Sequence, residues 1–207
     1  IYYATGAYWQ HQSGMVRSRT DEFNRQHDVH LQYNRLVEAH ESSQLADVIF
    51  LIGSSITIRT YPEEVRHKIR IIDQSSNLPI RCDLAYKLEN VSFDDFIWMG
   101  SNGSILKGLD LVLDYFLKNT RYNLHVVGPI DMDFLNYYRP QLLESSNIYF
   151  YGYVNTSSEL FEDLATYCSF HLFPSASEGC PGSVIALMQM GVIPVVSSWA
   201  AFDEIEN

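Results

Sequence analysis

The sequence predicts an α/β fold built on parallel β-sheets. Short apolar runs alternate along the chain with stretches whose apolar residues recur at helical spacing. Two of the runs, 48–52 and 193–196, are apolar at consecutive positions, which is typical of parallel strands buried on both faces. An order of strand, helix and strand favours crossover connections, and therefore a parallel sheet.

The composition fits a globular protein with a hydrophobic core. Of the 207 residues, 46% are hydrophobic, and the formal net charge is −11 at pH 7. We expect no nucleic-acid partner, because an acidic chain is repelled by a phosphate backbone. A small anionic ligand can still be held by local backbone amides and one lysine.

The cysteines are too few and too irregularly spaced for a disulfide framework or a zinc site. They are Cys82, Cys168 and Cys180, and we expect them to be reduced thiols of a cytoplasmic protein. No run approaches the roughly 18 apolar residues of a membrane-spanning helix, and no signal peptide opens the chain. We expect no bound metal, because the histidines lack metal-ligand spacing.

The first part of the chain predicts strands at 1–6, 47–53 and 69–73. The polar stretch 17–46 fits two surface helices. Ser54 or Ser55 is placed to cap a helix that reaches Tyr61, and Pro62 begins a further helical turn.

Residues 74–95 lack a sustained period and mix proline, asparagine, serine and charged residues, so we expect an irregular connection. We assign 1–78 to a partial N-terminal Rossmann-like domain, 79–94 to a linker and 95–207 to a C-terminal Rossmann-like domain.

The second part of the chain predicts a regular alternation. The expected strands are 96–100, 124–128, 148–152, 171–173 and 193–196, and the expected helices are 109–117, 134–143, 157–165 and 182–190. Pro140 is expected to interrupt or bend the second of these helices, and 202–205 has the pattern of a helix start.

The stretch 172–198 carries the most informative pattern. Pro174 closes a buried strand, because proline cannot donate to a ladder. The polar turn 175–181 follows with one carboxylate, Glu178, and a helix begins at Gly182. Such a turn puts backbone amides and a helix N-terminus at the carboxyl edge of a parallel sheet, where anions and polar ligands bind.

The pattern P-S-x-x-E-G-x-x-x-S-V, followed by M-x-x-G-x-I-P-V-V-S, resembles the donor-site signature of nucleotide-sugar glycosyltransferases of family 4. The resemblance extends upstream to Lys107 and Gly108, and more faintly over the rest of the chain. It implies the GT-B fold, of which this chain would carry the donor-binding domain and the later part of the acceptor domain. Both ends look cut, so we expect a fragment that transfers sugar poorly by itself.

The resemblance also implies a function in polysaccharide biosynthesis. Such an enzyme moves a hexosyl-type sugar from a nucleoside diphosphate sugar to an acceptor hydroxyl, with retention of configuration and without a metal or other cofactor. The acceptor would be a glycan or a lipid-linked molecule. The missing part would allow peripheral association with the inner face of the membrane.

Glu178 is the first candidate for catalysis. In the resembling enzymes, the matching glutamate accepts hydrogen bonds from hydroxyls of the donor sugar. The residues that would hold the sugar and diphosphate are Gly179, Cys180, Pro181, Gly182 and Ser183. The alternative is that Glu178 only caps the helix that follows.

Lys107 is the second candidate, because an ammonium near a diphosphate stabilises the charge of the leaving group. Gly100 and Gly103 would lie beside it in the donor site. The family's usual second cation is missing, since its position is Ser101, and we expect Asn102 and Gly103 to form a backbone anion nest instead. The alternative for Lys107 is a solvated lysine at a helix start.

Other positions leave alternatives open. The family's second glutamate, eight positions after Glu178, is Ala186 here. His11 lies a few residues later than the histidine with which relatives touch the donor sugar, so it is either a cleft residue or a surface residue of a mobile loop. Asp131 and Asp133 have the spacing of metal-dependent transferases of another fold, but capping of the following helix explains them.

Two other functions remain open. A sugar-nucleotide epimerase shares the GT-B fold, although its usual histidine and acid pattern is absent from this sequence. A Rossmann-like module that binds a nucleotide or sugar without turnover is favoured by Ala186 and Ser101.

Overall fold

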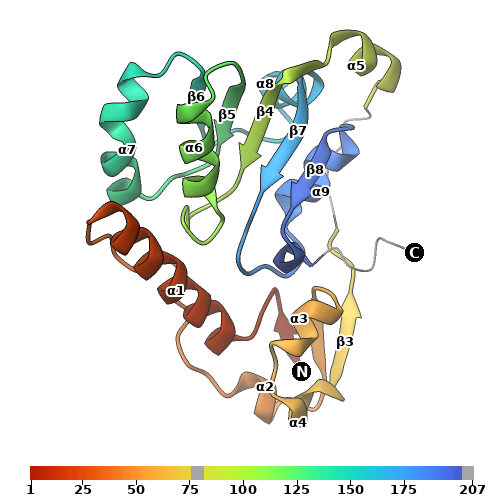
Figure 1. The fold of residues 1–207 in the computed structure, drawn as a ribbon. Helices are drawn as coiled ribbons and strands as arrows, with labels where there is room; N and C mark the ends of the chain where they lie inside the picture. The colour runs from red at the N-terminus through yellow and green to blue at the C-terminus, as the bar shows by residue number, and fades with distance from the viewer. Residues whose placement is uncertain (76–81, 202–207) are drawn as a thin grey trace. The chain divides into compact units, whose positions relative to one another are not determined.

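The computed structural model describes residues 1–75 and 82–201, which form two compact units with a parallel β-sheet each (Figure 1). The N-terminal unit contains residues 1–75, 175–181 and 197–201, and the C-terminal unit contains 82–174 and 182–196. The turn that carries Glu178 therefore packs with the N-terminal sheet. The division into acceptor-side and donor-side domains at 78 and 95 stays a prediction.

The sheet of the N-terminal unit confirms the strands predicted in this part of the chain. Its order is β1-β2-β3, with β1 at Tyr2–Ala4, β2 at Ile49–Ile52 and β3 at Ile69–Ile72. Ile49 and Leu51 of the central strand are fully buried. They pack with Ala4, Tyr61 and Val65 in one apolar cluster, so β2 organises the core of this unit.

The helices of the N-terminal unit are α1 (Trp9–His27), α2 (Ser42–Leu45), α3 (Ser55–Arg59) and α4 (Glu63–Arg66), with a short 3-10 helix at Ser198–Ala200. Ser54 caps α3, as predicted. Its hydroxyl oxygen accepts from the N–H of Ile56 at 3.2 Å, and its own N–H donates to the hydroxyl of Thr57 at 3.1 Å. Pro62 directly precedes α4, whose first turn holds two glutamates where the helix dipole favours acids.

The prediction of two surface helices over 17–46 is wrong for its second half. α1 ends at His27, residues 28–41 contain no helix, and α2 is a single turn. The helical spacing of apolar residues in this segment therefore does not correspond to a long helix.

Side chains of α1 explain why this segment is not helical. The carboxamide of Asn24 bonds both backbone groups of Leu31, at 2.8 and 3.1 Å. The hydroxyl of Ser13 bonds both backbone groups of Val37, each at 3.0 Å. These bonds satisfy backbone groups that a helical ladder would otherwise pair.

The sheet of the C-terminal unit is fully parallel and confirms the strands predicted there. The expected burial of 193–196 on both faces is wrong, because this strand lies at the edge of the sheet and leaves Ile193 and Val195 about half exposed. The strands are β4 (Ser92–Met99), β5 (Asn123–Val127), β6 (Ile148–Gly152), β7 (Cys168–Phe173) and β8 (Ile193–Val196), in the order β6-β5-β4-β7-β8. The order reverses between β4 and β7. The segments that follow these two strands begin at Gly100 and Pro174, so they leave the sheet at the switch point where open α/β sheets bind ligands.

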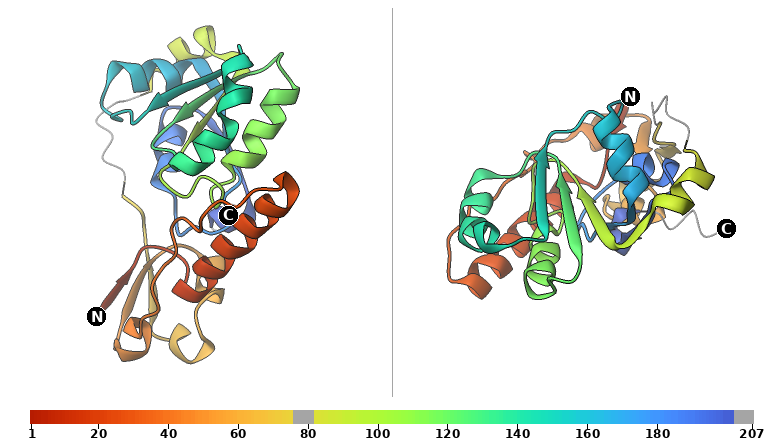
Figure 2. Two further views of the ribbon diagram at one scale, coloured as in Figure 1. Left: turned by 90° about the vertical axis from the view of Figure 1, so that its left-hand side faces the viewer. Right: turned by 90° about the horizontal axis from the view of Figure 1, so that it is seen from above.

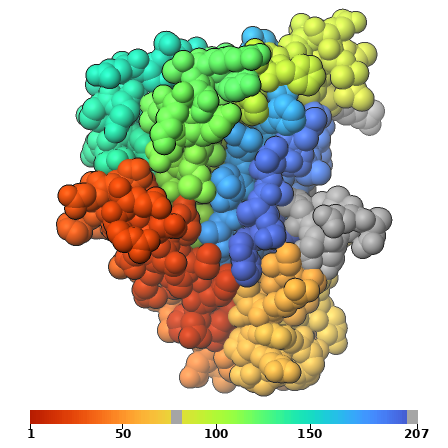
Figure 3. Space-filling view, in the orientation of Figure 1, coloured from red at the N-terminus to blue at the C-terminus, as the bar shows by residue number. Residues whose placement is uncertain are grey.

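Helices cover both faces of this sheet. They are α5 (Leu84–Asn90), α6 (Leu109–Lys118), α7 (Met132–Glu144), α8 (Glu159–Tyr167) and α9 (Gly182–Gln189). Phe96 of β4 contacts Phe116 of α6 on one face, with ring centroids 5.4 Å apart. Its neighbour Ile97 points to the other face, into an apolar cluster with Phe161 of α8 and Leu187 of α9. The view from above shows α8 across the sheet from α6 (Figure 2). The space-filling view shows α6 (green) and α7 (teal) at the surface of this unit (Figure 3).

Helix α7 runs through Pro140 rather than ending there, because the proline is exposed and water can reach the backbone carbonyl that it leaves unpaired. The helix start predicted at 202–205 lies outside the described residues. Among residues 1–75 and 82–201, no helix is long and apolar enough to cross a membrane.

The prediction of an irregular connection over 74–95 is wrong from Asp83 onward. α5 follows Asp83, whose carboxylate accepts from the N–H of Tyr86 at 3.0 Å, and β4 already begins at Ser92. Lys87 of α5 is only 4% exposed, and its ammonium donates to the carbonyls of Ala165 at 2.5 Å and Cys168 at 3.0 Å. Burial lowers the pKa of Lys87, and the carbonyls at the end of α8 compensate the buried charge.

We predict that Lys87→Met lowers the free energy of unfolding by roughly 1–3 kcal/mol, because it leaves buried carbonyls at the end of α8 without their donor. Lys118→Met is the matched control, since Lys118 is exposed in the last turn of α6. Urea denaturation of both variants measures the difference. Equal stability of the two would contradict this role of Lys87.

Candidate functional site

The candidate residues fall into two groups, one in each unit. Glu178, Gly179, Cys180, Pro181 and His11 belong to the N-terminal unit, whereas Gly100, Gly103, Lys107, Gly182 and Ser183 belong to the C-terminal unit. In the part of the chain that the structure describes, no grouping of histidine, cysteine and acidic residues is able to hold a metal ion.

The turn that carries Glu178 is fixed by hydrogen bonds from its own unit. The hydroxyl of Ser175 donates to the Glu178 carboxylate at 2.9 Å. The N–H of Glu178 donates to the carbonyl of Trp199 at 3.1 Å, and the hydroxyl of Ser197 donates to the carbonyl of Ser175. The half-buried carboxylate is thus held at a defined place.

Gly179 is packed against the ends of β1 and β2. A Cβ at this position would lie 2.4 Å from the carbonyl oxygen of Ile52, 2.7 Å from that of Thr5 and 2.8 Å from the Cα of Gly6. All three are backbone atoms that cannot move aside as a flexible side chain would. Only glycine fits, and this contact sets the position of the neighbouring Glu178.

Glu178 and Gly179 line a polar cavity of about 190 Å³ in the N-terminal unit. The segment after β1 and the start of α1 contribute Thr5, Gly6, Ala7, Trp9 and Gln12. The non-helical segment after α1 contributes Arg35, Val37 and His40. Neither Arg35 nor His40 was predicted as a site residue, because their segment of the sequence shows no motif.

His11 lies in the first turns of α1, so its placement in a mobile loop is wrong. Its ring is 4.7 Å from that of Trp199, and burial lowers its pKa. Its Nε2 atom is buried without a hydrogen-bond partner in the described part of the chain. His11 is absent from the lining of the polar cavity, so a role in a cleft stays a prediction.

Lys107 is buried, with 4% of its surface exposed, so the alternative of a solvated lysine is wrong. Its Nζ lies 5.1 Å from the centroid of the Phe173 ring, within cation–π distance. Its carbonyl accepts from the indole N–H of Trp98 at 3.3 Å, and its N–H donates to the carbonyl of Gly103 at 2.9 Å. The loop after β4 thus places an ammonium over the last residue of β7.

Gly108 allows the loop after β4 to come close to Pro174 at the end of β7. It has a φ of 71°, and a Cβ there would lie 2.6 Å from the carbonyl oxygen of Pro174. The close contact between the two loops therefore requires glycine directly after Lys107 and before α6.

Near the anion nest predicted at Asn102 and Gly103, backbone N–H groups bind the carboxylate of Asp131. The N–H groups of Gly103 and Ser104 donate to Asp131 at 3.0 and 2.7 Å, and the N–H of Asp131 donates to the hydroxyl of Ser104 at 3.2 Å. Asp131 stands at the N-cap of α7 but makes no side-chain cap bond there. The explanation of Asp131 by helix capping is therefore wrong, and its carboxylate orders the loop after β4 instead.

The remaining donor-site residues lie at the ends of their elements. Gly100 directly follows β4, and its N–H donates to the carbonyl of Val127 at 3.0 Å. Burial, and then the charge of Asp73, raise the pKa of the Cys180 thiol. Pro181 is buried, while Gly182 and Ser183 open α9.

Ala186 is buried among apolar side chains of α8, α9 and the sheet. A glutamate at this position would place a charge in that cluster, so the departure from the family pattern agrees with the packing of this chain.

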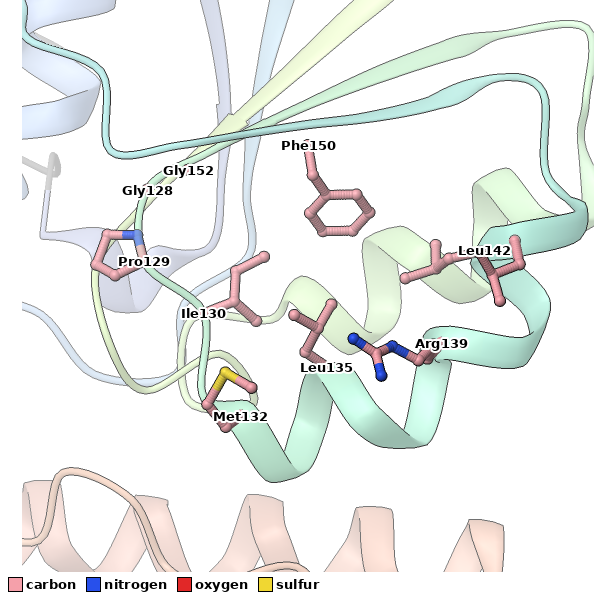
Figure 4. A pocket seen from close by; sticks show the side chains of 10 residues that line it. Gly128, Pro129, Ile130, Met132, Leu135, Arg139, Leu142, Phe150 and Gly152 are labelled. Atoms are coloured by element: carbon pink, nitrogen blue, oxygen red, sulfur yellow. The ribbon is translucent and has the colours of Figure 1, made fainter.

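A second cavity, apolar and about 430 Å³ in volume, lies beside α7 and β6. Leu135, Arg139 and Leu142 of α7 and Phe150 of β6 line it (Figure 4). It contains none of the residues predicted from the sequence to bind a ligand.

We predict that Gly179→Ala lowers the free energy of unfolding by about 1–3 kcal/mol, because the added methyl group overlaps backbone atoms of both strands. Gly182→Ala is the matched control, since a Cβ there meets no atom within 4 Å and alanine favours the helix. Thermal unfolding compares the two variants. An equal loss of stability in both would show that the packing of Gly179 is not tight.

The comparisons with known proteins agree with this architecture. No curated protein sequence matches the chain. Among solved structures, HepE from Anabaena in complex with UDP-glucose is 12% identical, with a TM-score of 0.62 over 80% of this chain and 49% of that chain. A mutant of S. aureus TarM, in complex with UDP and other ligands, is 15% identical, with a TM-score of 0.55 over 75% and 31%.

The lipopolysaccharide outer core galactosyltransferase WaaB is 19% identical, with a TM-score of 0.52 over 77% of this chain and 45% of that chain. The chain thus spans about half the length of HepE and WaaB. At these identities the likeness shows the fold alone, and it confirms the predicted α/β class with the Rossmann-like sheets of GT-B glycosyltransferases. The model of the family "Glycosyl transferases group 1" matches residues 94–207, slightly more than half of the chain. The chain therefore belongs to the group 1 glycosyltransferases.

Proposed function

We propose that this chain takes part in transferring a hexosyl-type sugar from a nucleoside diphosphate sugar to an acceptor hydroxyl, as a member of family 4. The proposed transfer retains the anomeric configuration and needs no metal or other cofactor. The acceptor is a glycan or a lipid-linked molecule. Residues 95–207 supply most of the donor site, and residues 1–78 face the acceptor.

The buried ammonium of Lys107 carries this proposal. It lies over Phe173 at the carboxyl edge of a parallel sheet, in the loop that leaves the switch point between β4 and β7. An ammonium at such an edge suits a diphosphate ligand, because it can stabilise the negative charge of the diphosphate. Within the C-terminal unit, Asp131 keeps the start of the same loop ordered through Gly103 and Ser104.

Each candidate residue has a separate part in the proposed reaction. The Glu178 carboxylate accepts hydrogen bonds from hydroxyls of the donor sugar and orients the ring. The bond between the anomeric carbon and the diphosphate oxygen breaks as the acceptor oxygen bonds to that carbon. The acceptor proton passes to the departing diphosphate, so no protein base is required, and Lys107 stabilises the charge on the diphosphate.

The solved structures support the choice of donor. HepE was crystallised with UDP-glucose and TarM with UDP, and both share the fold of this chain. UDP and its sugars are therefore the first ligands to test, followed by GDP and its sugars.

A second candidate function is the binding of a nucleotide sugar without turnover. Two observations favour it: the family's second glutamate is replaced by the buried Ala186, and the amides of Gly103 and Ser104 already bond a carboxylate. Hydrolysis of bound UDP-glucose to glucose and UDP separates the two functions. A module that only binds the nucleotide sugar releases no glucose.

We predict that Glu178→Gln weakens binding of UDP-glucose by about 1–3 kcal/mol more than binding of UDP, because hydrogen bonds from sugar hydroxyls to a charged acceptor are lost. The amide keeps an oxygen that can accept from Ser175, so the turn should stay in place. Calorimetric titration with both ligands measures the difference, and Glu64→Gln, an exposed position on α4, is the control. Equal losses for the two ligands would assign Glu178 a purely structural role.

We predict that Lys107→Met weakens UDP and UDP-glucose alike, by roughly 1.5–3 kcal/mol, because the charge-assisted bond to the diphosphate is common to both. Methionine preserves the apolar stem that packs near Phe173. The same titrations measure the effect, with Lys118→Met as the control on an exposed lysine. Unchanged affinity for UDP in the Lys107 variant would contradict the proposed donor site.

A further inference from the structure

Helix α7 has a second, largely apolar side beside the one that it buries in the core. The core side carries Phe134 and Tyr138, which are both fully buried. The second side borders the apolar cavity of the C-terminal unit, and its residues recur at helical spacing. They are Met132, Leu135, Arg139, Leu142 and Leu143.

We propose that this cavity binds a single-chain amphipathic anion, namely an alkyl chain that ends in a carboxylate. The alkyl chain occupies the cavity, and the carboxylate lies against the guanidinium of Arg139. The cavity volume of about 430 Å³ falls within the roughly 300–1,000 Å³ that is usual for small-molecule sites. The proposal does not depend on the proposed function, because none of the donor-site residues named there lines this cavity.

The rest of the lining suits an alkyl chain, because it offers almost only carbon. Pro129 and Ile130 contribute from the segment after β5, and Phe150 contributes from β6, which is the edge strand of the sheet. Met132 and Leu143 leave 64% and 82% of their surface exposed. An exposed apolar surface of this kind is typical of a ligand-binding groove, since an apolar ligand removes it from water.

Arg139 gives the lining its one charged residue, and this charge is positive in a chain of formal net charge −11. Among residues 1–75 and 82–201, no hydrogen bond or ion pair engages its guanidinium. No acidic residue of α7 is placed to pair with it either, because the positions three and four residues away are Leu135, Asn136, Leu142 and Leu143. A guanidinium matches a carboxylate with two parallel hydrogen bonds, so Arg139 selects the charge of the ligand.

The direction of the Arg139 side chain brings the charge and the apolar lining together. Figure 4 shows it extending along α7 toward Leu135, on the side of the helix that faces Phe150. Helical side chains point toward the N-terminus of their helix in this way. Arg139 is exposed, so a carboxylate against it stays in contact with water while the alkyl chain is buried. The site therefore avoids the cost of burying a charge.

Calorimetric titration of the whole chain with hexanoate, octanoate and decanoate tests the alkyl part of the site. Each ligand is used below the concentration at which it forms micelles. The affinity should rise roughly three- to fourfold for each added methylene group, because each group buries further apolar surface. The methyl NMR signals of Met132, Leu135 and Leu142 should shift. An affinity independent of chain length, or shifts confined to other methyl groups, would overturn the proposal.

Decanol and decylamine test the charge, because they have the same alkyl chain as decanoate. Decanoate should bind about fivefold more tightly than decanol, and decylamine should bind more weakly than either. Arg139→Gln should abolish the preference for decanoate over decanol, whereas Arg59→Gln, at an exposed arginine of α3, should leave it intact. Asn136→Glu, at an exposed position, should reduce it, because the new carboxylate can pair with Arg139. Thermal unfolding verifies that each variant folds, and a preference that persists in Arg139→Gln would contradict the proposal.

Other occupants of the cavity would give different results. Displacement of decanoate by UDP would assign the cavity to the nucleotide and overturn the proposal. Binding to vesicles of phosphatidylglycerol and phosphatidylcholine without binding of monomeric decanoate would overturn it in favour of a membrane-binding surface. A dimer in sedimentation velocity that Leu143→Glu dissociates would overturn it in favour of a second copy of the chain.

Discussion

The position of Glu178 depends on one close packing contact. The carboxyl ends of neighbouring parallel strands lie at the same edge of a sheet, so the segments that follow β1 and β2 lie close together there. Gly179 fits between the carbonyl groups of Thr5 and Ile52 with no space for a Cβ. The adjacent carboxylate, the bond from Ser175 and the polar cavity are all arranged around that contact.

In the C-terminal unit a tightly packed glycine likewise positions its neighbour, which there is a lysine instead of a glutamate. Gly108 passes within contact distance of Pro174, and this approach carries Lys107 over Phe173. In both units a glycine lets the chain come close to a strand end, and the neighbouring residue supplies the ionisable group. Backbone packing thus fixes a carboxylate in one unit and an ammonium in the other.

The protein uses its own charged groups to order the polar loops. Asp131 bonds the amides of Gly103 and Ser104, and Lys87 bonds the carbonyls at the end of α8. Each side chain neutralises the partial charge of unpaired backbone groups, which would be costly to bury alone. The loop after β4 is therefore ordered by Asp131 within its own unit, while Arg35 stands on a segment ordered by Asn24 and Ser13.

The strands, most of the helices and the α/β class could be predicted from the amino-acid pattern, because apolar periodicity and the positions of glycine and proline report local structure. It also indicated the turn at Glu178 and the cap at Ser54, whose signals lie within a few residues. Three features could not be predicted in this way: residues 28–41 are not helical, Lys107 is buried, and Asp131 bonds the amides of Gly103 and Ser104. These features depend on hydrogen bonds and packing between segments far apart in the chain, which leave no periodic mark on the sequence.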